Sequence, residues 1–279
     1  MNKSVLAVLL CFLLGFVGES FAQIYDTAGA RALEKARMAK AKVKSMKQMS
    51  GDKVTSQIDF DEQGNRVSEF SQSWDGRVEI NYIDGRRSHG VMKSREGDQI
   101  CEYSYNYDAD GNLVEQQQKS ARGTLIGKWV WVYENGELVK QMFEYIDGSP
   151  PMGDGGPMYR EHSTNIKFSS TGGLVRTKEI DAWASTADGG SFIKTFHEYD
   201  KDGRLLRTEV NHRPQMEREG SPNRPGGSVI VYNYDERGLL TGKSEEAKEE
   251  EESPGSEKLI FMAPVSRESG PEFVYEFWP

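Results

Sequence analysis

Hydrophobic and polar residues alternate along most of the chain from residue 54 onward. A period of two residues is typical of β-strands, because successive side chains point to opposite faces. Four runs carry aromatic residues on one of their two faces, namely CEYSYNY, KWVWVY, SVIVYNY and EFVYEFW. The aromatic rows of the first two runs are Tyr103, Tyr105, Tyr107, Trp129, Trp131 and Tyr133. The pattern therefore predicts many strands, several of which present an aromatic row to one side.

A short turn motif recurs after aromatic strand ends, in FDEQGNRV, YDADGNLV, YDKDGRLL and YDERGLLT. An Asp at the first turn position accepts hydrogen bonds from backbone N–H groups, and a Gly three residues later adopts the positive φ that closes a hairpin. The residues in these roles are Asp61, Gly64, Asp108, Gly111, Asp200, Gly203, Asp235 and Gly238. Each motif thus predicts a tight connection between two neighbouring antiparallel strands.

Repeated hairpins predict the fold class for residues 51–279. We expect an all-β protein, an antiparallel β-meander of repeated hairpins that forms a large twisted sheet or partly closed barrel-like shell, preceded by one N-terminal helix. Segments 149–157 and 212–228 are rich in Pro and Gly, and segment 244–258 is strongly acidic. These three segments are predicted to be loops.

The turn motif resembles the YD, or Rhs-type, repeats of exported bacterial proteins, whose unit carries a Tyr-Asp-x-x-Gly-Arg-Leu core. YDKDGRLL matches this core directly, while Asn112 or Leu239 replaces the Arg in two other copies. The resemblance covers residues 55–245 discontinuously, and the spacing between the turns is irregular. It implies an all-β body of paired strands with a scaffolding role.

Residues 23–50 differ from the rest, since they are basic and contain helix-forming residues. A helix is predicted over 27–49, with Asp26 or Thr27 as its cap and Gly51 after its end. The apolar stripe at helical spacing consists of Leu33, Ala36, Val43, Met46 and Met49. This basic amphipathic helix either docks on the acidic body or forms a partly ordered leader; the alternative is weak contact with an anionic envelope surface.

Residues 1–22 have the pattern of a secretory signal peptide. Lys3 precedes an apolar run of thirteen residues, and Ser20 and Ala22 form a small-x-small cleavage signal. The run is shorter than the roughly 20 residues that a membrane-spanning helix needs. We therefore expect cleavage before Gln23 and export to the periplasm, the cell surface or the medium.

Charge and cysteine content narrow the candidate functions. The net charge of −9 divides into +5 over residues 23–50 and −14 over 51–279. The acidic body argues against nucleic acid as a partner, because phosphate binding requires a basic surface. After signal cleavage Cys101 is the single cysteine, so an internal disulfide is excluded, and an inert buried thiol is favoured over a nucleophile.

Local motifs give no support for catalysis. The four histidines are far apart, and the sequence holds neither a nucleophile elbow nor a phosphate-binding glycine loop. The alternating carboxylates after Tyr107 lack the spacing of a calcium loop, and turn chemistry explains them. We accordingly predict no catalytic residues, no metal and no cofactor.

The leading hypothesis is an exported, non-enzymatic protein of a bacterial envelope, which serves binding or scaffolding toward an unknown protein or glycan. The second is a carbohydrate-binding module that uses the aromatic rows as a platform, although such rows more often pack in a core. The third is a secreted hydrolase with a dispersed site. Exposure of Trp129 and Trp131 separates the first two hypotheses.

Overall fold

The computed structural model describes residues 27–73, 76–145, 161–172, 174–186, 189–214, 226–247 and 272–279. The predicted signal peptide, the 149–157 loop and most of the other two predicted loops lie outside these residues. The described chain begins with helix α2 (Ala28–Lys40) and continues as strands. The strands are β1 (Val43–Ser50), β2 (Lys53–Phe60), β3 (Arg66–Ser73), β4 (Gly76–Ile83), β5 (Arg86–Ser94), β6 (Gln99–Tyr107), β7 (Leu113–Ser120), β8 (Leu125–Glu134), β9 (Glu137–Tyr145), β10 (Glu161–Thr171), β11 (Leu174–Thr186), β12 (Gly189–Tyr199), β13 (Leu205–Pro214), β14 (Gly226–Tyr234), β15 (Leu240–Ala247) and β16 (Glu272–Phe277).

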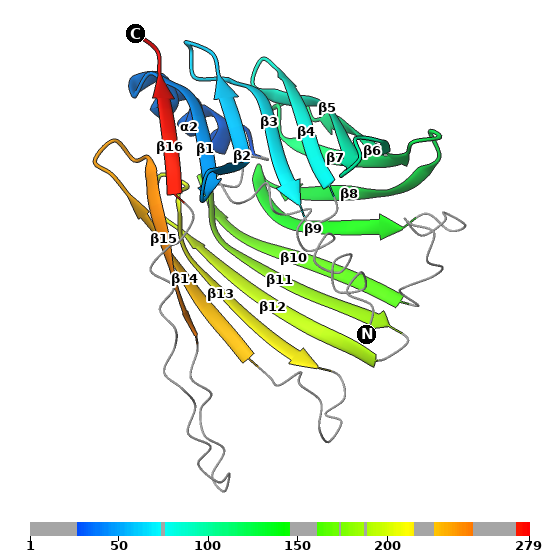
Figure 1. Ribbon diagram of the computed structural model, residues 1–279. Helices are drawn as coiled ribbons and strands as arrows, with labels where there is room; N and C mark the ends of the chain where they lie inside the picture. The colour runs from blue at the N-terminus through cyan, green and yellow to red at the C-terminus, as the bar shows by residue number, and fades with distance from the viewer. Residues whose placement is uncertain are drawn as a thin grey trace, which may run out of the picture.

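All the described strands belong to one 16-stranded antiparallel sheet, so the predicted β-meander is confirmed. Each strand from β1 to β15 pairs with its neighbours in sequence, and β16 returns to pair with β1. The sheet therefore curves into a nearly closed barrel-like shell, with β16 and the C-terminus beside β1 (Figure 1). The two ends of the strand order, β15 and β16, meet at a line that we call the seam.

Helix α2 is shorter than the predicted 27–49 helix. The Thr27 hydroxyl caps it by accepting a hydrogen bond from the Ala30 N–H at 3.1 Å, and Lys42, at φ +55°, marks its end. Residues 43–50 form β1, which pairs with β2 on one side and with β16 on the other. Two ladders of hydrogen bonds outweigh the modest helix propensity of these residues, and Val43, Ser45 and Met46 are buried.

The Asp-x-x-Gly segments form tight turns along one edge of the sheet. In the β6–β7 turn, the Asn112 N–H donates to the Asp108 carboxylate at 2.7 Å, and the Gly111 N–H donates to the Asp108 carbonyl oxygen at 3.1 Å. Turns at Asp61, Asp200 and Asp235 repeat this arrangement. In a meander every even-to-odd connection lies at the same end of the strands, so these turns share one edge, called here the turn edge.

Beside the turn edge, the same cross-strand pair recurs in six hairpins. An aromatic residue at the last or next-to-last position of one strand lies opposite the first or second residue of the following strand, and a β-bulge adjoins each pair. The pairs are Phe60 with Arg66, Tyr82 with Arg87, Tyr107 with Leu113, Tyr133 with Leu138, Tyr199 with Leu205 and Tyr234 with Leu240. Four pairs are apolar, and two place an arginine at the leucine position.

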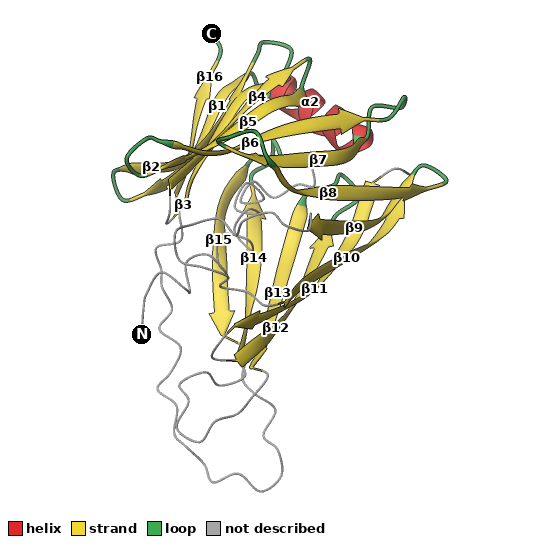
Figure 2. Ribbon diagram, turned by 90° about the vertical axis from the view of Figure 1, so that its right-hand side faces the viewer, coloured by secondary structure: helices red, strands yellow, loops and turns green. Residues whose placement is uncertain are grey.

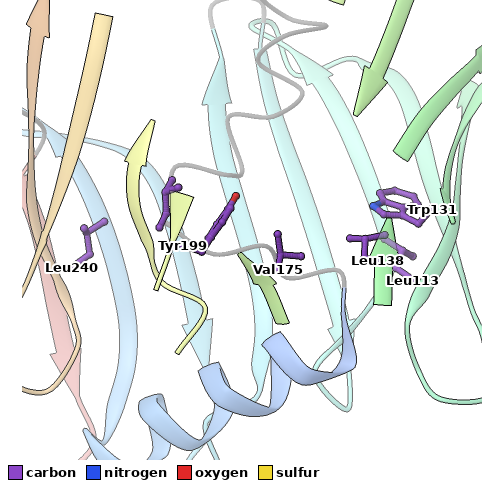
Figure 3. Packing of buried hydrophobic residues seen from close by; sticks show 7 residues of the cluster. Leu113, Trp131, Leu138, Val175, Tyr199 and Leu240 are labelled. Carbon is purple, nitrogen blue, oxygen red and sulfur yellow. The ribbon is translucent and has the colours of Figure 1, made fainter. Parts of the chain in front are cut away.

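The apolar members of these pairs build the main hydrophobic cluster. Its buried residues are Leu113, Trp131, Leu138, Val175, Tyr199, Leu205 and Leu240. Figure 3 shows six of them spread in a row beside α2, from Leu240 at one end to Trp131 at the other. The core therefore gathers near the turn edge and is contributed by strands from β7 to β15.

Tyrosine hydroxyls join neighbouring strands near the turn edge. Four tyrosine hydroxyls each donate a hydrogen bond to a backbone carbonyl oxygen near the start of the preceding strand. The oxygen–oxygen distances are 2.9 to 3.2 Å. The pairs are Tyr107 to Arg87, Tyr133 to Leu113, Tyr234 to Leu205 and Tyr275 to Leu240. The last of these bonds crosses the seam, so β15 and β16 are linked by the same contact that the sheet uses internally.

The outer strand faces carry charged side chains that pair across strands. Examples are Lys93 with Glu79 at 2.7 Å, Lys194 with Glu179 at 2.8 Å and Lys128 with Glu115 at 3.5 Å. Among the helices that the structure describes, none has the length and apolarity of a membrane span.

Candidate ligand pocket at the N-terminal helix

Helix α2 lies across the turn edge and contacts turns that are distant in sequence (Figure 2). The Ala28 N–H donates to the Asn112 side-chain oxygen at 2.9 Å, and the Arg31 guanidinium donates to the Gly111 carbonyl oxygen, both in the β6–β7 turn. The Arg37 side chain reaches the β14–β15 turn at Gly238. The helix thus bridges turns from opposite parts of the strand order.

The β2–β3 turn touches the helix backbone itself. A Cβ added to Gly64 would lie 2.6 Å from the Ala39 nitrogen and would also collide with the Lys35 carbonyl oxygen. Gly64 has φ +80°, which disfavours any other residue independently of space. Only glycine allows this turn and α2 to approach so closely.

A buried ionic cluster fixes the middle of α2. The Glu34 carboxylate accepts two hydrogen bonds at 2.7 Å from the Arg66 guanidinium, which also donates to Glu69 at 3.0 Å. Tyr82 donates its hydroxyl proton to the same Glu69 oxygen. Burial, the largest single influence, lowers the pKa of Arg66, but the charges of Glu34, Tyr82 and Glu69 and the hydrogen bond to Glu34 together raise this pKa well above its usual value. Burial, followed by the charge of Glu69, raises the pKa of Tyr82.

The arginine in this cluster occupies a position that is leucine in other hairpins. Arg66 follows its turn as Leu113 follows the β6–β7 turn, and both lie opposite an aromatic residue. A buried charge requires a partner, and Glu34 of α2 supplies it in bidentate geometry. The substitution of arginine for leucine in one repeat therefore specifies where the helix docks.

A pocket of about 200 Å³ lies between α2 and the turns β2–β3 and β4–β5. Its lining residues are Ala28, Arg31, Ala32, Glu34, Lys35, Gly64, Asn65, Asp84, Gly85 and Arg86. The lining contains two acidic residues, Glu34 and Asp84. Both carboxylate oxygens of Glu34 accept hydrogen bonds from Arg66, whereas Asp84 does not contact Arg66. Three cations and one carboxylate that is not bound by Arg66 give the pocket a positive lining.

Two of these cations converge on one tyrosine. The guanidinium carbons of Arg31 and Arg86 lie 5.3 and 5.6 Å from the centre of the Tyr107 ring, within cation–π range. A Cβ on Gly111 would lie 2.7 Å from an Arg86 nitrogen and 3.6 Å from an Arg31 nitrogen. Two like charges are therefore held near the same point at one side of the pocket.

The predicted aromatic rows pack inward. Trp131 is only 4% exposed and belongs to the main hydrophobic cluster, while Trp129, Tyr105, Tyr107 and Tyr133 pack against that cluster. Tyr103 packs against a second cluster around Cys101. The aromatic rows therefore contribute to the hydrophobic core. Core packing is the alternative to the exposed sugar-binding platform of the second hypothesis.

Cys101 is fully buried and accepts a hydrogen bond from the Gln118 side chain at 3.6 Å. Burial raises the pKa of its thiol, so the nucleophilic thiolate is disfavoured. Within the described ranges, no three His, Cys, Asp or Glu side chains gather in a way that could hold a metal ion.

A second buried polar group lies inside the shell on β12. His197 Nδ1 is 2.8 Å from the Thr208 hydroxyl oxygen of β13, and Lys178 lies opposite His197 on β11. Burial, followed by the charge of Lys178, lowers the pKa of His197 to about 3. The imidazole is therefore neutral across the physiological range.

The sequence indicated α2 as basic but did not identify the pocket cations. Arg31 and Lys35 are two of the seven basic residues of segment 23–50, and Arg86 stands in the turn YIDGRR. Comparison of the turn sequences could have indicated the ionic cluster. When FDEQGNRV and YIDGRR are aligned with YDADGNLV, Arg66 and Arg87 stand at the position of Leu113. A basic residue at a core position predicts a buried acidic partner.

No protein-family model matches the chain, and no curated protein matches it either. The likeness to solved structures is weak, as three examples show. A porin-like protein from Bacteroides uniformis ATCC 8492 is 9% identical with a TM-score of 0.45, over 85% of this chain and 97% of that one. TarM is 14% identical with a TM-score of 0.21, over 38% of this chain and 21% of that one. TcdB2-TccC3-TEV is 13% identical with a TM-score of 0.19, over 70% of this chain and 16% of that one. These values are too low to indicate a shared family.

Proposed function

We propose that this chain is an exported envelope protein with a non-catalytic binding or scaffolding role. The observation that carries the proposal is the fixed docking of α2 across the turn edge, where buried Glu34 and Arg66 hold it beside a positively lined pocket. Rigid packing around a pocket favours binding, because little conformational entropy is lost when a ligand enters a preformed site.

The two faces of the sheet support a role in water. Most aromatic residues pack inside the shell, while the outer strand faces carry Lys–Glu pairs beside single exposed apolar residues such as Val231 and Val274. The YD-type turns support scaffolding, since they repeat a rigid hairpin around the shell.

Export is tested by expressing the full-length chain from a bacterial host with its own first 22 residues. We expect the protein outside the cytoplasm, with an intact mass that corresponds to a chain beginning at Gln23. A variant with Leu9→Arg and Leu13→Arg interrupts the apolar run and should stay inside the cell at full length. Full-length wild-type protein in the cytoplasm would contradict the proposal.

The non-catalytic role is tested by incubating the exported protein with chromogenic glycoside, ester and peptide substrates. We expect no turnover above that of heat-inactivated protein. Turnover that copurifies with the protein and is abolished by a single substitution, such as His197→Gln, would instead establish the hydrolase hypothesis.

A further inference from the structure

We draw no further inference here: the strongest candidate, the seam between β15 and β16, whose facing edges share no ladder among the described strands and which Tyr275 bridges at the turn edge, carries nothing because nothing in the structure shows what covers it.

Discussion

At the scale of single residues, charge inside the shell is tolerated where partners are fixed. Arg66 and Arg87 stand where other repeats have leucine, and Glu34, Glu69 and Tyr82 gather around Arg66. Burial of an ion pair costs desolvation energy, so such a cluster contributes specificity of docking more than stability. His197 avoids the cost of a buried charge in another way, because it is buried in its neutral form.

The His197 pKa predicts a pH dependence of stability. The folded pKa is about 3, whereas an unfolded histidine titrates near 6.5. Between these values the unfolded chain binds a proton that the folded chain does not, so this contribution to the free energy of unfolding decreases as pH falls from about 6.5 to about 3. Denaturant titrations at pH 7, 5 and 4 measure the free energy of unfolding. Its decrease with falling pH should be smaller in His197→Gln than in wild type, by a few kcal/mol at most.

The matched control is His89→Gln on β5, where the histidine is exposed. This variant should follow the wild-type pH profile. If His197→Gln and wild type lose stability in parallel, the buried imidazole is not the group responsible.

At the scale of elements, one helix organises a whole edge of the sheet. The Asp-x-x-Gly turns form from local hydrogen bonds, whereas α2 is held by contacts to residues about 30 to 200 positions away. The buried face of the helix consists of Ala30, Glu34 and Met38, spaced by one helical turn each. This face supplies one ion pair and two apolar contacts, which add to the hydrogen bonds of Ala28 and Arg31 with the β6–β7 turn.

Replacing Glu34 by glutamine tests the contribution of this ion pair. The change leaves the buried Arg66 without its bidentate carboxylate, and loss of one partner of a buried ion pair costs about 3 kcal/mol. We expect a lower free energy of unfolding and faster hydrogen exchange of the amides in residues 28–40. Glu62→Gln, in the exposed part of the β2–β3 turn, should change neither measurement. Unchanged exchange in Glu34→Gln would show that the ion pair does not hold the helix.

At the scale of the whole molecule, closure of the shell depends on the last strand. β16 pairs with β1 through a full ladder, and Tyr275 donates across the seam to β15. Elsewhere in the sheet the same tyrosine contact adds to an existing ladder, as Tyr234 does between β14 and β13. The seam is thus the weakest line of the shell.

Two tyrosine substitutions compare the seam with the interior of the sheet. Tyr275→Phe and Tyr234→Phe each remove one hydrogen bond and should each lower the free energy of unfolding by about 1 kcal/mol. Only Tyr275→Phe should also accelerate hydrogen exchange in β16 and the start of β15, because no ladder joins those strands. Equal exchange in both variants would mean that the seam is held by other contacts.

The sequence predicted the local features because short-range chemistry produces them. Alternation gave the strands, the Asp-x-x-Gly spacing gave the turn positions, and Thr27 was among the two expected helix caps. The predicted end of the helix was wrong, because residues 43–50 form β1. These residues favour a helix in isolation, and only pairing with β2 and β16 makes them extended. Pairing partners at such separations leave no local signal.

What the sequence by itself determined is an all-β meander of repeated hairpins with a basic N-terminal helix. What only the tertiary structure decided is the return of β16 to β1, the inward packing of the aromatic rows, and the gathering of Arg31, Lys35 and Arg86 around one pocket. The physical reason is distance along the chain. A turn depends on residues within four positions, whereas closure, burial and charge convergence depend on curvature accumulated over sixteen strands.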